Sequence, residues 1–154
     1  MLNTLSRLSI ILIVGALAAM AADPLLGTWK VIPESVKPGG NGPKKIVLKF
    51  EPGDVAGDVK FTLTGEMNEQ PYSYTWTAKP GGGKFPVEGQ TGTQQVEFQR
   101  PAENHSITIH YRGGQESARH ESTISRDGKV LTTKSRTKTR AGDIVESEAQ
   151  YQKQ

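Results

Sequence analysis

The sequence predicts an all-β protein, a single antiparallel up-and-down β-barrel of about 8–10 strands that follows an N-terminal signal peptide. Three observations predict this class. Apolar residues alternate along short runs, turn signals rich in Gly, Pro, Asn and Asp recur roughly every 8–14 residues, and no amphipathic helix follows the first segment. An open sheet would need a second layer to cover its apolar face, and no sequence remains to supply one. The predicted sheet therefore closes on itself.

Residues 1–21 have the three parts of a secretory signal peptide. Arg7 precedes an apolar stretch, and Ala19-Met20-Ala21 places small residues at the two positions that signal peptidase reads. The stretch of about 13 residues is shorter than the roughly 20 that span a bilayer, so an uncleaved membrane anchor is the alternative reading. We predict a signal peptide at 1–21, a lipocalin-like barrel domain at 22–154, and export to the periplasm or the cell exterior.

Composition excludes several functions. The whole chain has a formal net charge of +3, and loss of Arg7, the single charged residue of 1–21, leaves +2. This balance does not suit a nucleic-acid binder, which neutralises many phosphates with clustered cations. There are no cysteines, which excludes a disulfide, a thiol nucleophile, a Cys metal site and a lipoprotein anchor.

Ten alternating runs follow the signal segment. The expected strands are 28–32, 44–51, 58–65, 71–79, 84–88, 93–100, 105–112, 116–125, 129–140 and 144–152. The turns between them, such as "PGGG", "GG" and "DG", supply the positive or preset φ values that tight turns need.

Two of these turns determine which face of each strand points inward. "GG" at 113–114 and "DG" at 127–128 each fit a two-residue hairpin loop. The expected partners are Ile109 with Ala118, Ile107 with His120, Glu121 with Lys134, and Ile124 with Leu131. The last hairpin fits two or three loop residues. Opposite charges across strands favour three, which places Lys138 opposite Glu146 and Arg136 opposite Glu148.

These registers predict an uneven interior. The earlier strands send bulky apolar residues inward, namely Ile46, Leu48, Phe50, Val59, Phe61, Leu63, Tyr72, Tyr74, Trp76, Val96 and Phe98. The later strands send inward Ile107, Ile109, Tyr111, Ala118, His120, Ser122, Ile124, Leu131, Thr133, Ser135, Thr137, Thr139, Val145, Ser147, Ala149 and Tyr151. Small hydroxyl-bearing residues on one wall leave space and hydrogen-bonding capacity, and a barrel of this size can hold one small ligand.

The chain resembles the calycin group. The resemblance is carried by "GTW" (27–29) opening the first strand, a mature length of about 130 residues, a meander of some ten strands and the terminal "QYQKQ". Within that group it is similar to lipocalin-like and fatty-acid-binding-like barrels, above all to small exported bacterial lipocalin-like proteins. The resemblance implies that Trp29 plugs one end of the barrel, with Gly27 allowing close chain passage.

The resemblance also implies features that this chain lacks. In lipocalins an Arg near the last strand packs on the tryptophan, and here Arg140 is the nearest substitute. The fatty-acid-binding Arg-x-Tyr triplet aligns with Ala149-Gln150-Tyr151, so the Tyr matches and the Arg does not. The helical lid of that family has no counterpart in the Pro- and Gly-rich segment 33–43.

Candidate ligand-binding residues lie on the predicted inner face. His120, the only inward His in this prediction, can hydrogen-bond a polar group or ligate a haem iron, or can simply be satisfied by neighbouring hydroxyls. Tyr74 and Trp76, with Tyr72, form an aromatic wall or ordinary core. The remaining polar candidates are Tyr111, Tyr151, Thr133 and Ser135.

No catalytic residue, metal site or cofactor is predicted. His105 and His110 are expected outward or in a turn, which argues against a three-His metal site. No nucleophile–base–orienter set is found. Three functions remain open. The barrel holds a small, partly apolar molecule, or it is a filled non-catalytic accessory module that contacts proteins through its loops, or it is an enzyme on the same scaffold.

Overall fold

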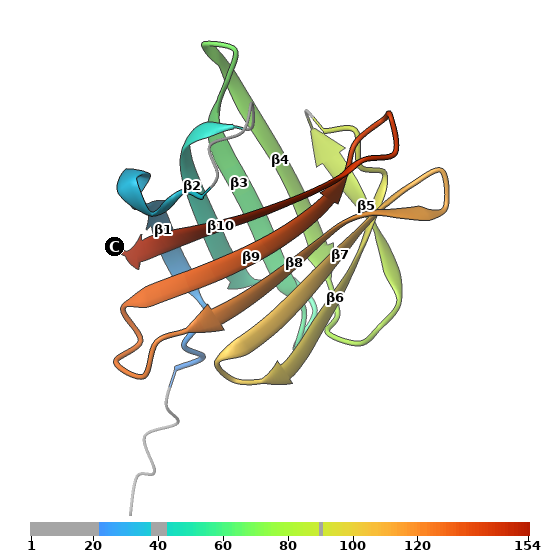
Figure 1. Cartoon of the computed structure of the whole chain (residues 1–154). Helices are drawn as coiled ribbons and strands as arrows, with labels where there is room; N and C mark the ends of the chain where they lie inside the picture. The colour runs from blue at the N-terminus through green and yellow to red at the C-terminus, as the bar shows by residue number, and fades with distance from the viewer. Residues whose placement is uncertain (1–21, 38–42, 90) are drawn as a thin grey trace, which may run out of the picture.

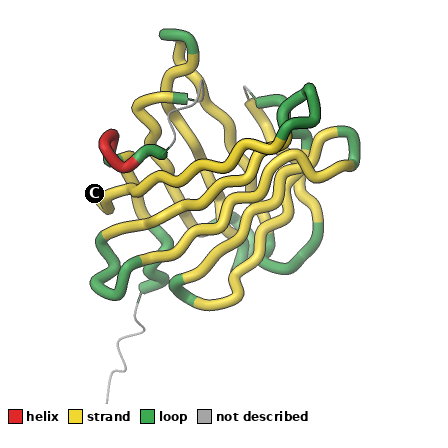
Figure 2. The backbone as a smooth tube through the Cα atoms, viewed as in Figure 1, coloured by secondary structure: helices red, strands yellow, loops and turns green. Residues whose placement is uncertain are grey.

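The structure, a computed structural model, describes residues 22–37, 43–89 and 91–154. The predicted signal peptide at 1–21 lies outside the described residues. The described chain forms a closed antiparallel barrel of ten strands in which sequence neighbours are spatial neighbours (Figures 1 and 2). The predicted fold class is confirmed, and each predicted run corresponds to one strand.

The strands are β1 (Gly27–Val31), β2 (Lys44–Pro52), β3 (Val59–Met67), β4 (Gln70–Ala78), β5 (Lys84–Gly89), β6 (Gln95–Ala102), β7 (His105–Arg112), β8 (Gln115–Ile124), β9 (Val130–Lys138) and β10 (Ile144–Lys153). A single-turn 3₁₀ helix, η1 (Pro33–Ser35), follows β1. This turn is the one helical element in the described part of 33–43, and residues 38–42 lie outside the described residues.

The first and last strands close the barrel (Figure 1). β1 pairs with β10, with Trp29 opposite Lys153 and Val31 opposite Tyr151. Beyond η1, the chain returns to β10 and forms an isolated bridge between Lys37 and Glu148. This closure leaves no unpaired sheet edge between the two strands.

The late hairpins keep the predicted faces, but both of their loops differ from the prediction. The Asp-Gly hairpin places Ile124 opposite Leu131, as predicted, but Ser125 N–H donates to Val130 O at 2.8 Å, so the loop has four residues, 126–129, instead of two. In the last hairpin, Thr139 N–H donates to Asp143 O at 2.8 Å, so the three loop residues are 140–142. The expected register is therefore wrong by two residues. Arg136 faces Glu146 and Lys134 faces Glu148, which preserves both the opposite-charge pairing and the inward faces.

The core fills one end of the barrel. Its buried members come from β1–β6 and from the ends of β8–β10, and they include Trp29, Phe50, Phe61, Trp76, Val96, Phe98, Ile124, Leu131 and Tyr151. Phe61 stacks on Trp76 with ring centroids 4.9 Å apart, and Trp76 lies 5.1 Å from Phe98. Such aromatic packing contributes beyond the buried area alone. We call this filled end, built from the residues above, the apolar half.

Trp29 closes the apolar half. Its side chain is fully buried, and its indole N–H donates to Leu25 O at 2.9 Å. Lys153 Nζ lies 5.0 Å from the Trp29 ring centroid and donates to Pro24 O at 2.8 Å. Lys153 thus takes the place of the expected arginine. Gly27 has a φ of 131°, and a Cβ there would lie 3.0 Å from Lys153 Cε, so glycine gives the lysine room.

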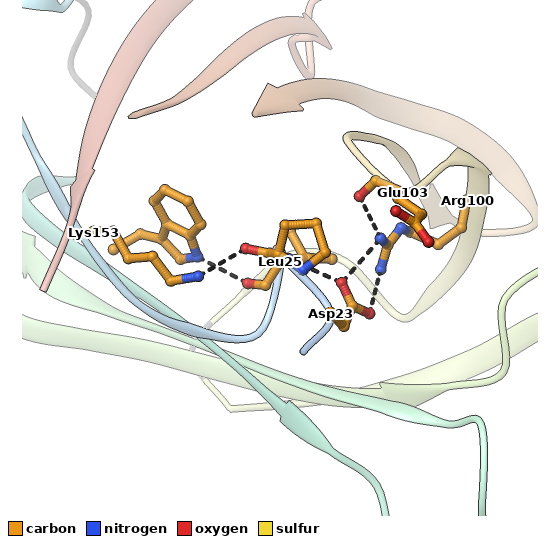
Figure 3. Close-up of polar contacts among 7 residues, drawn as sticks. Asp23, Leu25, Arg100, Glu103 and Lys153 are labelled. Atoms are coloured by element: carbon orange, nitrogen blue, oxygen red, sulfur yellow. Dashed lines mark hydrogen bonds and ion pairs between the residues drawn. The ribbon is translucent and has the colours of Figure 1, made fainter. Parts of the chain in front are cut away.

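The segment before β1 is held across the closed end. Arg100 binds both carboxylate oxygens of Asp23, at 2.9 and 3.1 Å, and donates to Glu103 O at 2.6 Å (Figure 3). Burial raises the pKa of Asp23, but the Arg100 hydrogen bonds and charge outweigh this and hold it below 3.8. Leu25, two residues after Asp23, is buried at the same closed end of the barrel.

Candidate binding site

The interior becomes polar and solvent-accessible away from the closed end. Strand register across β8, β9 and β10 defines four inward rows: Ile124–Leu131–Tyr151, Ser122–Thr133–Ala149, His120–Ser135–Ser147 and Ala118–Thr137–Val145. The first row is buried, the second is mostly buried, the third is half-buried, and the last ends in Val145, which is 45% exposed. The inward orientation of the predicted Ser/Thr wall is confirmed, and its third and fourth rows retain solvent exposure.

Strand β7 extends this polar wall, which corrects the prediction. Register shifts lie on both of its sides, between Gln99 and Ala102 against β6 and between His110 and Tyr111 against β8. They place His110 opposite the inward Val96 and Ala118. Ser106, Thr108 and His110 therefore face inward. The predicted inward orientation of Ile107, Ile109 and Tyr111 is wrong.

The outer surface accommodates the displaced residues. Tyr111 donates to Glu97 Oε2 at 3.2 Å, and Lys84 Nζ lies 3.8 Å from its ring centroid. Ile109 is 4% exposed although it lies outside the core cluster. Its neighbours across the strands are Glu97 and Arg119, whose aliphatic stems can cover it. These contacts offset the loss of interior burial for the apolar face of β7.

Ser117 is the extra residue in β8 that accompanies the second shift. Tyr111 pairs with Glu116 and His110 with Ala118, so Ser117 has no partner in the ladder. Its hydroxyl donates to His110 O at 3.3 Å. A bulge of this kind changes which face a side chain occupies, and bulges are frequent beside functional sites. Here the bulge brings His110 into the interior.

The two inward histidines form a contacting pair. The ring centroids of His110 and His120 are 4.8 Å apart, with the planes at 87°. Each Nδ1 is held by a hydroxyl, His110 at 3.2 Å from Thr93 Oγ1 and His120 at 2.7 Å from Ser135 Oγ. These bonds orient the rings and leave each Nε2 free of a hydrogen-bond partner within the described chain.

Both imidazoles are neutral at physiological pH. Burial lowers the pKa of His120 to about 4. Burial, reinforced by the nearby His120, lowers the pKa of His110 well below 6.5. A neutral imidazole presents one donor and one acceptor, so each ring can bind an uncharged polar group.

Aromatic rings connect the histidines to the apolar half. Tyr74 lies 6.0 Å from His110 in an edge-to-face arrangement and 5.9 Å from Phe61, with Tyr72 6.1 Å away on the other side. Burial raises the pKa of Tyr74, so its hydroxyl stays protonated. Trp76 Nε1 is buried without a hydrogen-bond partner among the described residues. An unmet buried donor of this kind is uncommon in folded proteins.

The other predicted site residues divide between the two halves. Tyr151 is inward and buried at the boundary row, and burial raises its pKa to about 12. Thr133 is inward, but its hydroxyl is already bonded to Ser122 at 2.8 Å. Ser135 holds His120. Thus His120, Ser135, Tyr74, Trp76, Tyr151 and Thr133 share the interior, and Tyr111 does not.

His110 is the residue that sequence reasoning missed. Val96 and Phe98 were correctly expected inward, and His110 faces inward because it pairs with Val96. The sequence gives only a weak signal for the inward orientation of His110, because a regular hairpin without register shifts would place the apolar residues of β7 inside. His105 is outward as expected, with Nε2 2.8 Å from Glu121 Oε1. We call the inward set Tyr72, Tyr74, His110, His120, Ser135, Thr137 and Ser147 the polar half.

The chemistry available in the polar half is hydrogen bonding to a neutral group. The Ser135–His120 contact has the distance of a nucleophile–base pair. However, no carboxylate bonds to His120 within the described chain, and its low pKa makes it a weak base. No group of three His, Cys, Asp or Glu side chains suited to a metal ion occurs among the described residues.

Two surface depressions lie outside this interior. One, of about 470 Å³, lies between the β3–β4 hairpin and the loop before β6, where Met67, Tyr72 and Gly92 contribute to its lining. The other, of about 320 Å³, borders Arg100 and Pro80 near the closed end. The first adjoins the polar half through Tyr72, so the β3–β4 hairpin borders both features.

No family model matches the chain, and no curated protein matches it. The closed ten-stranded antiparallel barrel is compatible with a lipocalin- or calycin-like fold. In the described ranges, none of the helices has the length and apolar character to cross a membrane.

Proposed function

We propose that the protein is an exported, non-catalytic barrel that binds a small, partly apolar molecule in its polar half. One observation carries the proposal: inward side chains from several strands combine hydrogen-bonding groups with retained solvent exposure. His120, Ser135 and Ser147 lie side by side across three strands and are all half-buried. A filled core would bury such a row.

The inward orientation of the polar face of β7 also supports the proposal. Apolar burial favours the isoleucines inside, yet two register shifts turn the polar face of this strand inward. Departures from local preference concentrate at functional sites, because the stability they cost is retained only where it serves a purpose. The aromatic face of Tyr74 would contact the apolar body of the ligand, and the hydroxyls and imidazoles would orient its polar end.

Displacement of Nile red, an uncharged fluorescent dye, tests the proposal together with native mass spectrometry of the protein purified from its own host. We expect a retained small molecule and saturable dye binding. His120→Ala should weaken the dye affinity several-fold, whereas His105→Ala, on the outer face, should leave it unchanged. An absence of both retained ligand and dye binding would instead favour the alternative, an accessory module with a filled interior that contacts proteins through its loops.

A further inference from the structure

We infer that the polar half selects an uncharged ligand with a hydrogen-bond-accepting group and rejects both anions and cations of the same shape. This inference rests on the proposed function and names its ligand class. The inward positions of the polar half, from Tyr72 across to Ser147, contain no Asp, Glu, Lys or Arg within the described ranges. A buried charge without a partner is expensive, so a charged head group would lose its hydration without compensation.

The charged residues that do face inward are already used at the opposite end. Arg100 is paired with Asp23, and Lys153 is held by Pro24 O above the Trp29 ring. Along β6, the buried Phe98 lies between Arg100 and Val96, and Val96 is the residue that pairs with His110. These cations are therefore unavailable to a carboxylate in the polar half.

The polar groups without a hydrogen-bond partner indicate which chemical groups the ligand should carry. The hydroxyl of Tyr74 and the free Nε2 atoms of His110 and His120 are donors or acceptors that carry no formal charge. A hydroxyl, carbonyl or ether oxygen on the ligand would satisfy such groups, because each accepts a hydrogen bond without bringing a charge.

Three probes that share one alkyl chain separate the possibilities: decan-1-ol, decanoate and decylammonium. Their affinities for the mature protein can be measured at pH 7.5 by Nile red displacement and by calorimetry, below the concentrations at which they aggregate. We expect decan-1-ol to bind at least about tenfold more tightly than either ion, since only the ions lose charge hydration. Equal or tighter binding of decanoate or decylammonium overturns the inference and leaves ligand binding itself intact.

Adjacent residues at the mouth supply a matched pair of variants. Val145 faces inward and is 45% exposed, whereas Ile144 faces outward and is 48% exposed, so a lysine is tolerated at either position. Val145→Lys should improve decanoate binding about two- to fivefold, the range for a partly solvated ion pair. Ile144→Lys adds the same charge outside and should have no effect beyond the error of the measurement.

The remaining outcomes are also decisive. Equal responses of the two lysine variants would show that general electrostatics governs the preference, which contradicts the assignment to the polar half. Failure of decan-1-ol to bind overturns the inference, and if Nile red fails as well, the proposed function is overturned with it.

Discussion

The two halves of the barrel interior share β4 and β8–β10 but differ in how they are filled. In the apolar half, Trp29, Phe61 and Phe98 pack into a buried cluster that closes the barrel. In the polar half, His120 and Ser147 remain half-buried and carry polar groups. The comparison teaches that stability and binding capacity are separated along the barrel axis: one end is filled so that the other can stay accessible.

This division follows a cross-strand pattern. On β9, Leu131 and Thr133 belong to the buried rows, and Ser135 and Thr137 belong to the accessible ones. Apolar burial contributes roughly 25 cal/mol per Å² removed from water, so the filled rows dominate the folding free energy. The accessible rows contribute little to folding and are therefore free to be specified by a ligand.

The largest expected effect is that of Trp29→Ala, at the closed end of the apolar half. Removing the fully buried indole should lower the free energy of unfolding by about 3–5 kcal/mol, because the plug and its packing are lost together. Chemical denaturation measures this. Trp29→Phe should cost clearly less. A loss below about 1 kcal/mol for Trp29→Ala would contradict the assignment of the plug.

Low pH should reduce the free energy of unfolding because of a buried histidine in the polar half. Unfolded His120 takes up a proton near pH 6.5, but in the folded protein its pKa is about 4. The folded state therefore binds fewer protons between these values, and the free energy of unfolding should fall as pH drops from about 6.5 to about 4. The expected loss is about 2–3 kcal/mol, and it is absent above pH 6.5.

A pair of histidine variants checks the origin of this acid effect. His120→Gln should reduce the dependence of unfolding free energy on pH between 4 and 6.5, and the slope that remains should come from His110, whose pKa burial also lowers. His105→Gln, at the residue that is bonded to Glu121 outside, should leave the slope largely intact. The carboxyl of Asp23, whose pKa lies below 3.8, adds its loss only at lower pH. An unchanged slope in His120→Gln would mean that His120 is not buried in the folded protein.

A smaller effect is expected where Lys153 packs on Trp29. Lys153→Met removes the hydrogen bond to Pro24 O and the cation above the indole but keeps the aliphatic stem. We expect a loss of about 1–2 kcal/mol in unfolding free energy. Lys153→Arg should recover part of it. If Lys153→Met is as stable as the parent, the lysine is not the functional replacement for an arginine.

The smallest effects compare two serines on either side of the boundary. Ser122→Ala leaves the Thr133 hydroxyl buried without its 2.8 Å partner and should cost about 1 kcal/mol. Ser147→Ala, in the half-buried row, should change stability by less than about 0.5 kcal/mol. Thermal unfolding of both variants in one buffer gives the comparison. Equal losses of stability in the two variants would contradict the distinction between the buried and the accessible rows.

Sequence reasoning succeeded where turn type and alternation agreed. The register expected from the Asp-Gly turn, with Ile124 opposite Leu131, is observed and sets the inward positions of β8 and β9, although the hairpin closes with four loop residues instead of two. In the last hairpin the three-residue loop is 140–142 in place of the expected 141–143, which shifts the strand register by two residues. The faces survived that error because a shift of two leaves the side-chain period unchanged.

The same reasoning failed on β7, where the shift is by one residue. The Gly-Gly turn does place Arg112 opposite Gln115 as expected, but the extra Ser117 reverses the phase two residues later. A bulge has no distinctive sequence signature here. A one-residue shift exchanges the two faces, which is why Tyr111 moved outside and His110 inside.

The sequence by itself determined the ten strands, their meander order, the closed barrel and the Ser/Thr character of β8–β10, because these depend on local turn chemistry and on a period of two. Only the tertiary structure decided the inward face of β7, the pairing of His110 with His120, and the position of Lys153 over Trp29. These features arise where strands distant along the chain meet, as when closure brings β1 to β10. Their energies depend on partners that no local pattern contains.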